Sequence, residues 1–368
     1  MTRKKNLLLV ALMAGLLSLL AMGCGGTEEP SEQTADSPAP AEPTTEDSSK
    51  TFKVALITDT GGVNDRGFNE FSIAGLTDAQ DQLGVETRVY ISESEENYLP
   101  NLVAAADSGY DLIISVGFLL ATPTIEVASQ YPNVYFAGVD HFYGPPGDEF
   151  CEGSGTCVLP NTLGLQYPSE EAGYLAGIVA ALTSKSGTIS TVGGIKIPPV
   201  DNWIAGFQQG ALSANPDIKL LNAYSQDFVD QAKCKEIALD QIAQGSDIVF
   251  QVAGLCGLGA LDAANEQGAW GIGVDSDQSF AGDHILTSAL KPLRESVFET
   301  IRQVVDGEFQ GGQNFFFSVQ EFPDAQLLSP FNTTVSQEAK DAVEVATEQL
   351  ISGEIDPTAS VEEVGVTE

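Results

Sequence analysis

Short apolar runs alternate with amphipathic stretches from residue 52 onward. Four runs rich in β-branched residues predict buried strands in the first part of the chain: KVALIT, GVETRVY, DLIISVG and NVYFAGV. Apolar residues recur with helical spacing at residues 67–83, 98–108 and 122–130. Strands that alternate with helical segments of this length predict right-handed βαβ units on a parallel sheet.

A second series of the same kind begins near Tyr167. Its predicted strands are TISTVGG, IKLLNAY, DIVFQVA and WGIGVDS, and its predicted helices cover residues 169–183, 203–214, 231–244 and 258–266. After residue 282 a tail adds the strands HILTSAL and NFFFSVQ and helices over residues 291–306 and 336–352. Because this tail is too small for a third domain, we expect it to cross between the two series.

Two successive series predict an α/β protein of two lobes, each a doubly wound parallel sheet flanked by helices. We expect the first lobe to comprise residues 51–167 with about 291–322, and the second residues 168–290 with about 323–368. Several crossing segments would form a multi-segment hinge, and the carboxyl ends of the strands would face a cleft. This architecture is the clamshell of extracellular solute-binding proteins, a periplasmic-binding-protein-like fold that closes about a hinge.

The first 50 residues follow a different pattern. Three basic residues precede an apolar run over residues 7–22, which ends in small residues and Cys24. This order resembles a lipobox and predicts a lipoprotein signal peptide over residues 1–23, with Cys24 lipidated; a plain signal peptide is the alternative. Residues 24–50 are rich in Pro, Ser, Thr and Glu, which predicts a disordered acidic tether. We therefore expect an extracytoplasmic protein, anchored to the cell membrane through Cys24.

The charge of the chain narrows the choice of partners. The 52 acidic residues outnumber 16 basic ones, for a formal charge of −36, and the residues after position 50 alone carry −33. So acidic a chain is a poor partner for nucleic acid, because phosphate contacts need clustered Lys and Arg. The same field disfavours a phosphate-rich ligand. With two histidines and no C-x-x-C or H-E-x-x-H spacing, the sequence predicts neither a metal site nor a cofactor.

Four further cysteines fit an exported, oxidising setting. Cys151 and Cys157 bracket a short loop, so we expect a Cys151–Cys157 disulfide to staple a turn. Cys234 and Cys256 stand near the starts of two successive predicted helices. A parallel sheet brings such helix starts to one edge, so a Cys234–Cys256 disulfide fits the layout, although the sequence leaves it open.

The loop after the first predicted strand combines acids, amides, glycines and an aromatic residue in the order DTGGVNDRGFNE. Asp59 and Asn69 offer oriented acceptors and donors, and the glycines let the backbone approach a ligand. A turn with a helix N-cap is the simpler interpretation of the acids and amides. It does not explain Phe68, which has little core to fill at a helix start.

The loops of the second series offer matching candidates. Trp203 stands near a predicted helix start and mirrors Phe68, so the two rings are candidates to sandwich a flat ligand, although core packing is the alternative for either ring alone. Gly254 opens a Gly-rich turn into a helix, whose N–H groups can bind an oxygen-rich group. Asp275 and Lys291 follow strands, where they can bind hydroxyl groups or form a buried ion pair at the hinge.

The segments VALITDTGGVNDRGFNE, FQVAG, GIGVDSDQ and LTSALK, in that order, resemble the basic membrane protein family of bacterial lipoproteins. Its PnrA-like branch comprises purine-nucleoside-binding components of ABC importers. The resemblance covers about residues 53–320 and implies a class I fold. It also implies that the base stacks on Phe68 and Trp203 and forms hydrogen bonds with Asp59 and Asn69. It implies that the ribose is held by Asp275, by Lys291 and by the backbone near Gly254.

Three positions depart from the pattern of that family. Gly67 replaces a commoner Ser, Trp203 replaces a Phe, and Cys256 lies within the Gly-rich turn. These departures leave the base preference open.

We therefore expect a monomeric, lipid-anchored solute-binding protein that captures a nucleoside, purine by resemblance, and delivers it to an ABC permease with its ATPase subunits. A sensory ligand-binding protein, whose closure signals to a membrane partner, is an open alternative. A nucleoside-hydrolysing enzyme is disfavoured, because the acids of the loops lack a clustered His or Cys set.

Overall fold

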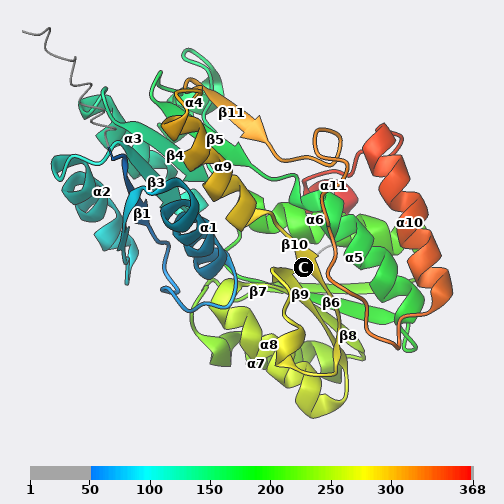
Figure 1. Ribbon diagram of the computed structural model, residues 1–368. Helices are drawn as coiled ribbons and strands as arrows, with labels where there is room; N and C mark the ends of the chain where they lie inside the picture. Colours follow the sequence, from blue (N-terminus) through cyan, green and yellow to red (C-terminus); the bar gives the residue numbers. More distant parts are fainter. Residues whose placement is uncertain (1–50, 366–368) are drawn as a thin grey trace, which may run out of the picture. The chain divides into compact units, whose positions relative to one another are not determined.

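The computed structural model describes residues 51–365, except for the side chain of Phe150. The predicted signal peptide, Cys24 and the predicted tether lie outside the described residues. Residues 50–368 form one compact unit. It contains two parallel sheets with helices packed on them (Figure 1).

The first sheet has six strands, which are β1 (Lys53–Ile57), β2 (Glu86–Tyr90), β3 (Leu112–Val116), β4 (Tyr135–Val139), β5 (Thr162–Gln166) and β11 (Gln313–Phe316). The second has five, which are β6 (Thr188–Gly193), β7 (Lys219–Tyr224), β8 (Ile248–Val252), β9 (Trp270–Asp275) and β10 (Ile285–Leu290). Their orders are β11-β5-β4-β3-β1-β2 and β10-β9-β8-β6-β7. Without β11, both sheets therefore have the same order, in which the first strand of each series lies between the second and the third.

The helices connect the strands as the βαβ pattern predicts. Those of the first series are α1 (Phe68–Leu83), α2 (Tyr98–Asp107), α3 (Ala121–Gln130) and α4 (Glu149–Ser154), with short 3₁₀ turns at Glu95–Asn97 and Phe118–Leu120. Those of the second are α5 (Ser169–Thr183), α6 (Pro198–Ala214), α7 (Gln231–Ala243), α8 (Gly254–Gln267) and the 3₁₀ turn Ser279–Ala281. The tail adds α9 (Leu293–Val305), α10 (Gln337–Ser352) and α11 (Val361–Val364).

Apolar side chains fill both faces of each sheet. One face of the six-stranded sheet packs on α1 and α9, which lie side by side in Figure 1, and the other packs on α2 and α3. The five-stranded sheet packs on α5, α6 and α10 on one face and on α7 and α8 on the other. Both sheets are therefore doubly wound, and the predicted fold class is confirmed.

Helices α5 and α6 pack with their backbones in close approach. Gly173 and Gly177 of α5 face Gly206 and Gly210 of α6, and a Cβ atom at any of the four would overlap the main chain of the other helix. This contact fixes α6 firmly against α5, which matters for the aromatic residue that α6 carries.

The chain passes three times between the two sheets: after β5, after β10, and between β11 and the bridge that joins Leu328 to Ala289 of β10. These passages lie near residues 167, 291 and 322, where the sequence predicts the lobe boundaries. The division into two separately moving lobes stays a prediction.

Two helices begin earlier than the sequence pattern indicates. Helix α6 starts at Pro198, five residues before the predicted start at Trp203, because proline fits the first turn of a helix and needs no N–H partner there. Helix α8 starts at Gly254, directly after β8, instead of at residue 258. Helix α4, within the first cysteine-bracketed segment, was not predicted at all.

The structure contains two disulfides, Cys151–Cys157 and Cys234–Cys256, with Cα–Cα distances of 4.5 Å and 5.6 Å. In the described part of the chain, every helix is too short or too polar to span a bilayer.

Candidate functional site

One pocket of about 610 Å³, its open mouth included, lies where the carboxyl ends of strands from both sheets meet. This is the position at which doubly wound sheets bind ligands. The loops after β1, β3, β4, β6, β7, β8, β9 and β10 all contribute to its lining. All seven residues that the sequence predicts as ligand-binding line it: Asp59, Phe68, Asn69, Trp203, Gly254, Asp275 and Lys291.

Asp59 presents one carboxylate oxygen to the pocket. Its Oδ1 accepts hydrogen bonds from the Thr60 N–H at 2.7 Å and from the Tyr98 hydroxyl. Within residues 51–365, no hydrogen-bond donor reaches its Oδ2. Burial raises the pKa of Asp59 to about 6, because desolvation disfavours the charged form and the bonds from Tyr98 and Thr60 offset this only in part.

Asn69 is committed to the protein rather than to a ligand. Its Oδ1 accepts the Asp59 N–H at 2.9 Å, and its Nδ2 donates to the Thr60 carbonyl at 3.3 Å and to Asp65 Oδ2 at 2.9 Å. Both amide protons are thereby used, and one lone pair of Oδ1 is left for a ligand. In this structure Asn69 mainly positions Asp59.

Asp65 caps helix α1. Its carboxylate accepts the backbone N–H groups of Gly67, Asn69 and Glu70 at 2.7–3.1 Å. A carboxylate at this place satisfies otherwise unpaired donors and complements the helix dipole. The acids of this loop therefore divide between a structural cap and a carboxylate that faces the pocket.

Lys291 pairs with Asp140, a residue that the sequence analysis missed. Its Nζ lies 3.0 Å and 2.8 Å from the two carboxylate oxygens, and both side chains are buried. The same Nζ lies 5.3 Å from the centre of the Phe68 ring and 5.7 Å from that of Trp203. The sequence did contain a pattern that points to Asp140: this acid comes directly after strand β4, and Asp59 likewise comes after β1.

Asp275 is 8% exposed, and no residue in the described range donates a hydrogen bond to its carboxylate. Burial raises its pKa to about 6, opposed by the nearby charge of Lys291. Asp275 and Asp140 both have positive φ values, 65° and 61°, which are unfavourable for residues other than glycine. Backbone strain of this kind is typical of functional sites.

The two predicted aromatic residues differ in their surroundings. Phe68 is partly exposed at the start of α1, whereas Trp203 is 2% exposed and packs edge-on against Phe250 in the core. Trp203 is buried because α6 begins at Pro198, which moves it from the helix start into the second turn, against α5. It also lines the pocket.

The sequence analysis also missed Phe118, which lines the pocket from the 3₁₀ turn after β3. A further aromatic lining residue that it missed is Phe228. It lies in the loop of residues 225–230 after β7, is partly exposed, and lines the pocket with Gly254. The pattern that could have identified Phe228 is the same as for Phe68, an aromatic residue that comes after the end of a strand. Gly254 has a φ of +54° and lies near the Phe228 carbonyl.

Two contacts join the halves of the pocket at its rim. The Arg66 guanidinium lies 4.3 Å from the centre of the Phe280 ring, and the Ser276 hydroxyl donates to the Arg66 carbonyl at 3.0 Å. Arg66 belongs to the loop after β1, and the other two residues follow β9. Among residues 51–365, no cluster of three or more His, Cys, Asp or Glu side chains is arranged to hold a metal ion.

Residues 52–357 match the family described as ABC transporter substrate-binding protein PnrA-like. The chain is 32% identical to the CD4+ T-cell-stimulating antigen of Listeria monocytogenes, over 84% of this chain and 88% of that one. It is 33% identical to basic membrane protein A1 of Borrelia garinii, over 73% and 77% of the two chains. It is also 32% identical to a lipoprotein of Pyrococcus abyssi, over 83% and 73%.

A solved structure with a similar fold is a solute-binding protein of an ABC transporter system from Aeropyrum pernix. The two share 26% sequence identity and superpose with a TM-score of 0.73, over 85% of this chain and 95% of the other.

Proposed function

Because the chain belongs to the PnrA-like family of ABC transporter substrate-binding proteins, we propose that it captures a nucleoside in this pocket and delivers it to an ABC permease. The base is a purine. The protein does not turn its ligand over; it binds, closes and releases.

The carboxylate of Asp275 carries this proposal. A buried acceptor that lacks a donor is costly, so a ligand that supplies hydroxyl groups restores its hydrogen bonds. The backbone N–H of Lys291 donates to the Asp275 carbonyl at 3.0 Å, so the two residues lie side by side. The ammonium group of Lys291 has one proton that Asp140 does not use, and it can donate this proton to the same ligand. A ribose offers adjacent hydroxyls that satisfy an acceptor and a donor together.

A flat base fits between aromatic rings. Phe68 comes from the side of the six-stranded sheet and Phe228 from that of the five-stranded sheet, and both line the pocket with part of the ring exposed. We propose these two as the stacking pair, with Trp203 as packing beneath them. Stacking on two rings binds a heterocycle more strongly than it binds a free sugar.

The polar edge beside the rings favours a purine with N–H donors. Asp59 Oδ2 and the remaining lone pair of Asn69 Oδ1 are both acceptors. An edge that presents two acceptors binds a base edge that carries ring or exocyclic N–H groups. The neutral sugar edge of the ligand then faces Asp275 and Lys291.

The electrostatics favour a nucleoside over a nucleotide. Lys291 is the only cation among the described lining residues, and Asp140 already neutralises it. With a charge of −33 on residues 51–368, a phosphate group would meet repulsion without a compensating contact.

The relatives include lipoproteins, and the family supplies substrates to ABC transporters, so the protein works outside the cytoplasm at a membrane. We propose that a lipid on Cys24 anchors it and that it acts as a monomer. The permease and its ATPase subunits are the partners that this role requires.

A thermal-shift panel tests the proposal, since a ligand that binds only the folded state raises the melting temperature. Inosine, guanosine and adenosine should raise it more than uridine, and all of them more than ribose or inosine 5′-monophosphate. The Asp275→Asn variant tests the role of this carboxylate, and nucleosides should raise its melting temperature less than that of the wild type. If no nucleoside stabilises the protein, the proposal is wrong. Chromatography of inosine after long incubation should find it unchanged.

A further inference from the structure

We infer that the Cys234–Cys256 disulfide positions the ligand-contacting ring of Phe228 by fixing the loop of residues 225–230. The inference rests on the proposed function, because it concerns how that pocket holds a flat ligand. The disulfide acts through Phe228 and is not itself a contact of the ligand.

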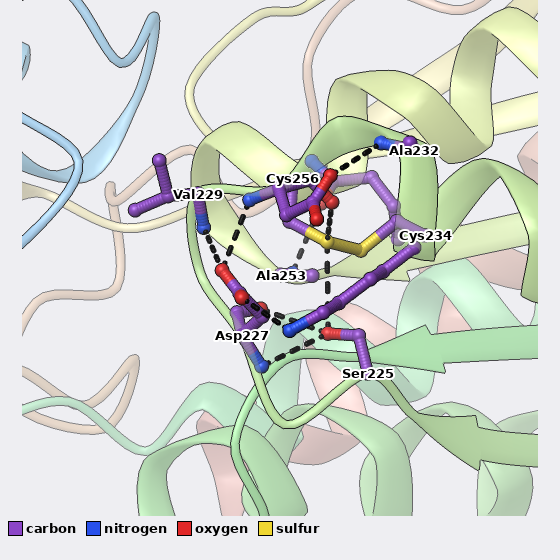
Figure 2. Close-up of a disulfide and its surroundings, with 10 residues drawn as sticks. Ser225, Asp227, Val229, Ala232, Cys234, Ala253 and Cys256 are labelled. Atoms are coloured by element: carbon purple, nitrogen blue, oxygen red, sulfur yellow. Dashed lines mark hydrogen bonds and ion pairs between the residues drawn. A yellow bond between two sulfur atoms is a disulfide. The ribbon is translucent and has the colours of Figure 1, made fainter.

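Cys256 touches the loop at its start, middle and end. Its backbone N–H donates to the Phe228 carbonyl at 3.0 Å. Its Sγ lies 2.9 Å from the Asp230 carbonyl and 3.6 Å from the Ser225 hydroxyl. In Figure 2 a dashed line joins Ser225 to the disulfide, and Asp227 bonds to other residues of the loop. Because the disulfide sulfur carries no proton, its contact with Asp230 is one of packing; a displaced Cys256 would release the hydrogen bond that it donates to Phe228 and the one that its Sγ accepts from the Ser225 hydroxyl.

Other contacts also hold the loop from outside. The N–H groups of Ser225 and Gln226 donate to the Gly193 and Gly194 carbonyls at 2.9 Å and 3.1 Å, and the Phe228 ring packs against Gly194. The loop follows β7, which is the edge strand of its sheet, and Val229 is 44% exposed. Inside the loop, Asp227 Oδ1 accepts the N–H groups of Val229 and Asp230 at 2.8 Å and 2.9 Å, and its Oδ2 accepts Lys233 Nζ at 2.6 Å. These bonds give the loop its shape, and the disulfide is the covalent link among the contacts that hold it in place.

The disulfide also joins the two segments that line this part of the pocket. Cys234 lies in the first turns of α7, directly after the loop, and Cys256 lies in the first turn of α8, two residues after Gly254. Both cysteines are fully buried. The covalent bond therefore fixes Phe228 relative to Gly254 before a ligand arrives, which lowers the entropy lost on binding.

A purely structural role would be to hold α7 against α8. Those helices already pack closely without it, because Gly259 of α8 has no side chain where the Gln231 main chain of α7 passes. A structural role predicts a lower melting temperature with unchanged affinity. A positioning role predicts a loss of affinity that depends on Phe228.

The test compares two disulfide-free variants by calorimetric titration with inosine at a temperature at which both are folded. Cys234→Ser/Cys256→Ser should bind inosine about three- to tenfold more weakly than the wild type, the cost of ordering one or two side chains on binding. Cys151→Ser/Cys157→Ser is the matched control, because the segment that this disulfide closes contributes no residue to the pocket, and it should bind like the wild type. Equal losses in both variants, or no loss in the first, would overturn the inference.

A double-mutant cycle with Phe228→Ala tests the dependence on the ring. In the Phe228→Ala background, removing Cys234–Cys256 should change the affinity less than about twofold. If it still weakens binding by the full factor, the disulfide acts by another route and the inference fails. Asp227→Ala keeps the cysteines paired but loosens the same loop, so it should show the same Phe228-dependent loss even if the disulfide-free variant does not fold.

Binding of nucleosides to the wild type distinguishes failure of the proposed function from failure of this inference. A wild type that binds no nucleoside overturns the proposed function and this inference together. A wild type that binds inosine, with a Cys234→Ser/Cys256→Ser variant that binds equally well, overturns the inference alone.

Discussion

The pocket has two walls of opposite chemistry. The polar wall consists of Asp59, Asp65, Asn69, Asp140, Asp275 and Lys291, and the apolar wall consists of Phe68, Phe118, Ile197, Pro199, Val200, Trp203, Phe228, Val252, Leu255 and Val274. Most of the polar wall follows strands of the six-stranded sheet, whereas most of the apolar wall belongs to the five-stranded sheet and its loops; Phe68 and Phe118 are the exceptions. Hydrogen bonds and one buried ion pair hold the polar wall; side-chain packing and a disulfide hold the apolar wall.

Because of this difference, the contributions of the two walls to stability and binding depend on different conditions. The polar wall contains titratable groups at low exposure, so its strength depends on pH and on the pairing of its charges. The apolar wall has no group that titrates near neutrality, so its strength depends on shape. The following substitutions test that separation.

The largest effect is expected at the ion pair. Lys291→Met leaves Asp140 buried without a partner, which should lower the free energy of unfolding by about 3–5 kcal/mol. Lys233→Met is the control, because Lys233 pairs with Asp227 at the surface, where its side chain is 50% exposed, and its loss should change the free energy of unfolding far less than Lys291→Met. Urea denaturation measures both. Equal losses would show that the pairing of buried charge does not govern the polar wall.

On the apolar wall, the two aromatic residues should separate stability from binding. Trp203→Ala removes a core side chain and should cost about 3–5 kcal/mol of stability. Phe228→Ala should leave most of the stability but weaken nucleoside binding by about 1–3 kcal/mol. Denaturation and calorimetry on both variants give the comparison. A Phe228→Ala protein with full affinity would contradict the assignment of the stacking pair.

The polar wall should respond to pH in two opposite ways. Asp59 and Asp275 have folded-state pKa values of about 6, above the ordinary value of 3.8. The folded protein therefore binds more protons than the unfolded chain between pH 4 and 6, so the stability from these groups is present below pH 4 and is lost as the pH rises through 6. Glu170 and Glu171, with pKa values raised to about 7 by burial, extend this loss to pH 7.

Ligand affinity should change in the opposite direction. Only the ionised carboxylates accept the N–H and O–H groups of a nucleoside on both oxygens, so affinity should rise about tenfold per group between pH 5 and 7. Calorimetry across that range tests this. Asp59→Asn and Asp275→Asn should each flatten the profile, and an unchanged slope in both variants would show that other groups cause it.

The smallest effect is expected at the rim contact that joins the walls. Phe280→Ala removes the ring beneath Arg66, and an exposed cation–π contact is worth about 0.5–1 kcal/mol. Inosine should dissociate about two- to fivefold faster, measured by stopped flow. Phe316→Ala is the matched control, because Phe316 is equally exposed, at 47%, but lies on β11 away from the pocket, and it should not change the rate.

The sequence predicts the fold and the position of the site well, because alternating strands and helices determine where the strand ends meet. Every predicted site residue ends a strand or lies in the loop or the first turns of the helix that follows one, and all of them line one pocket. The position after a strand does not predict a residue's role where tertiary packing determines whether its side chain is buried. Trp203 and Phe68 have similar sequence surroundings, but the glycine contact between α5 and α6 buries Trp203, and no local pattern reveals that approach. Asp140 and Phe228 also follow strands and were identified only once the pocket brought them together.

A crystal structure of the protein with bound inosine tests the central claim most directly. The account predicts the base between the rings of Phe68 and Phe228, its N–H edge toward Asp59, and the ribose hydroxyls against Asp275 and Lys291. A base that contacts Trp203 but not Phe228, or a ribose turned away from Asp275, would contradict it.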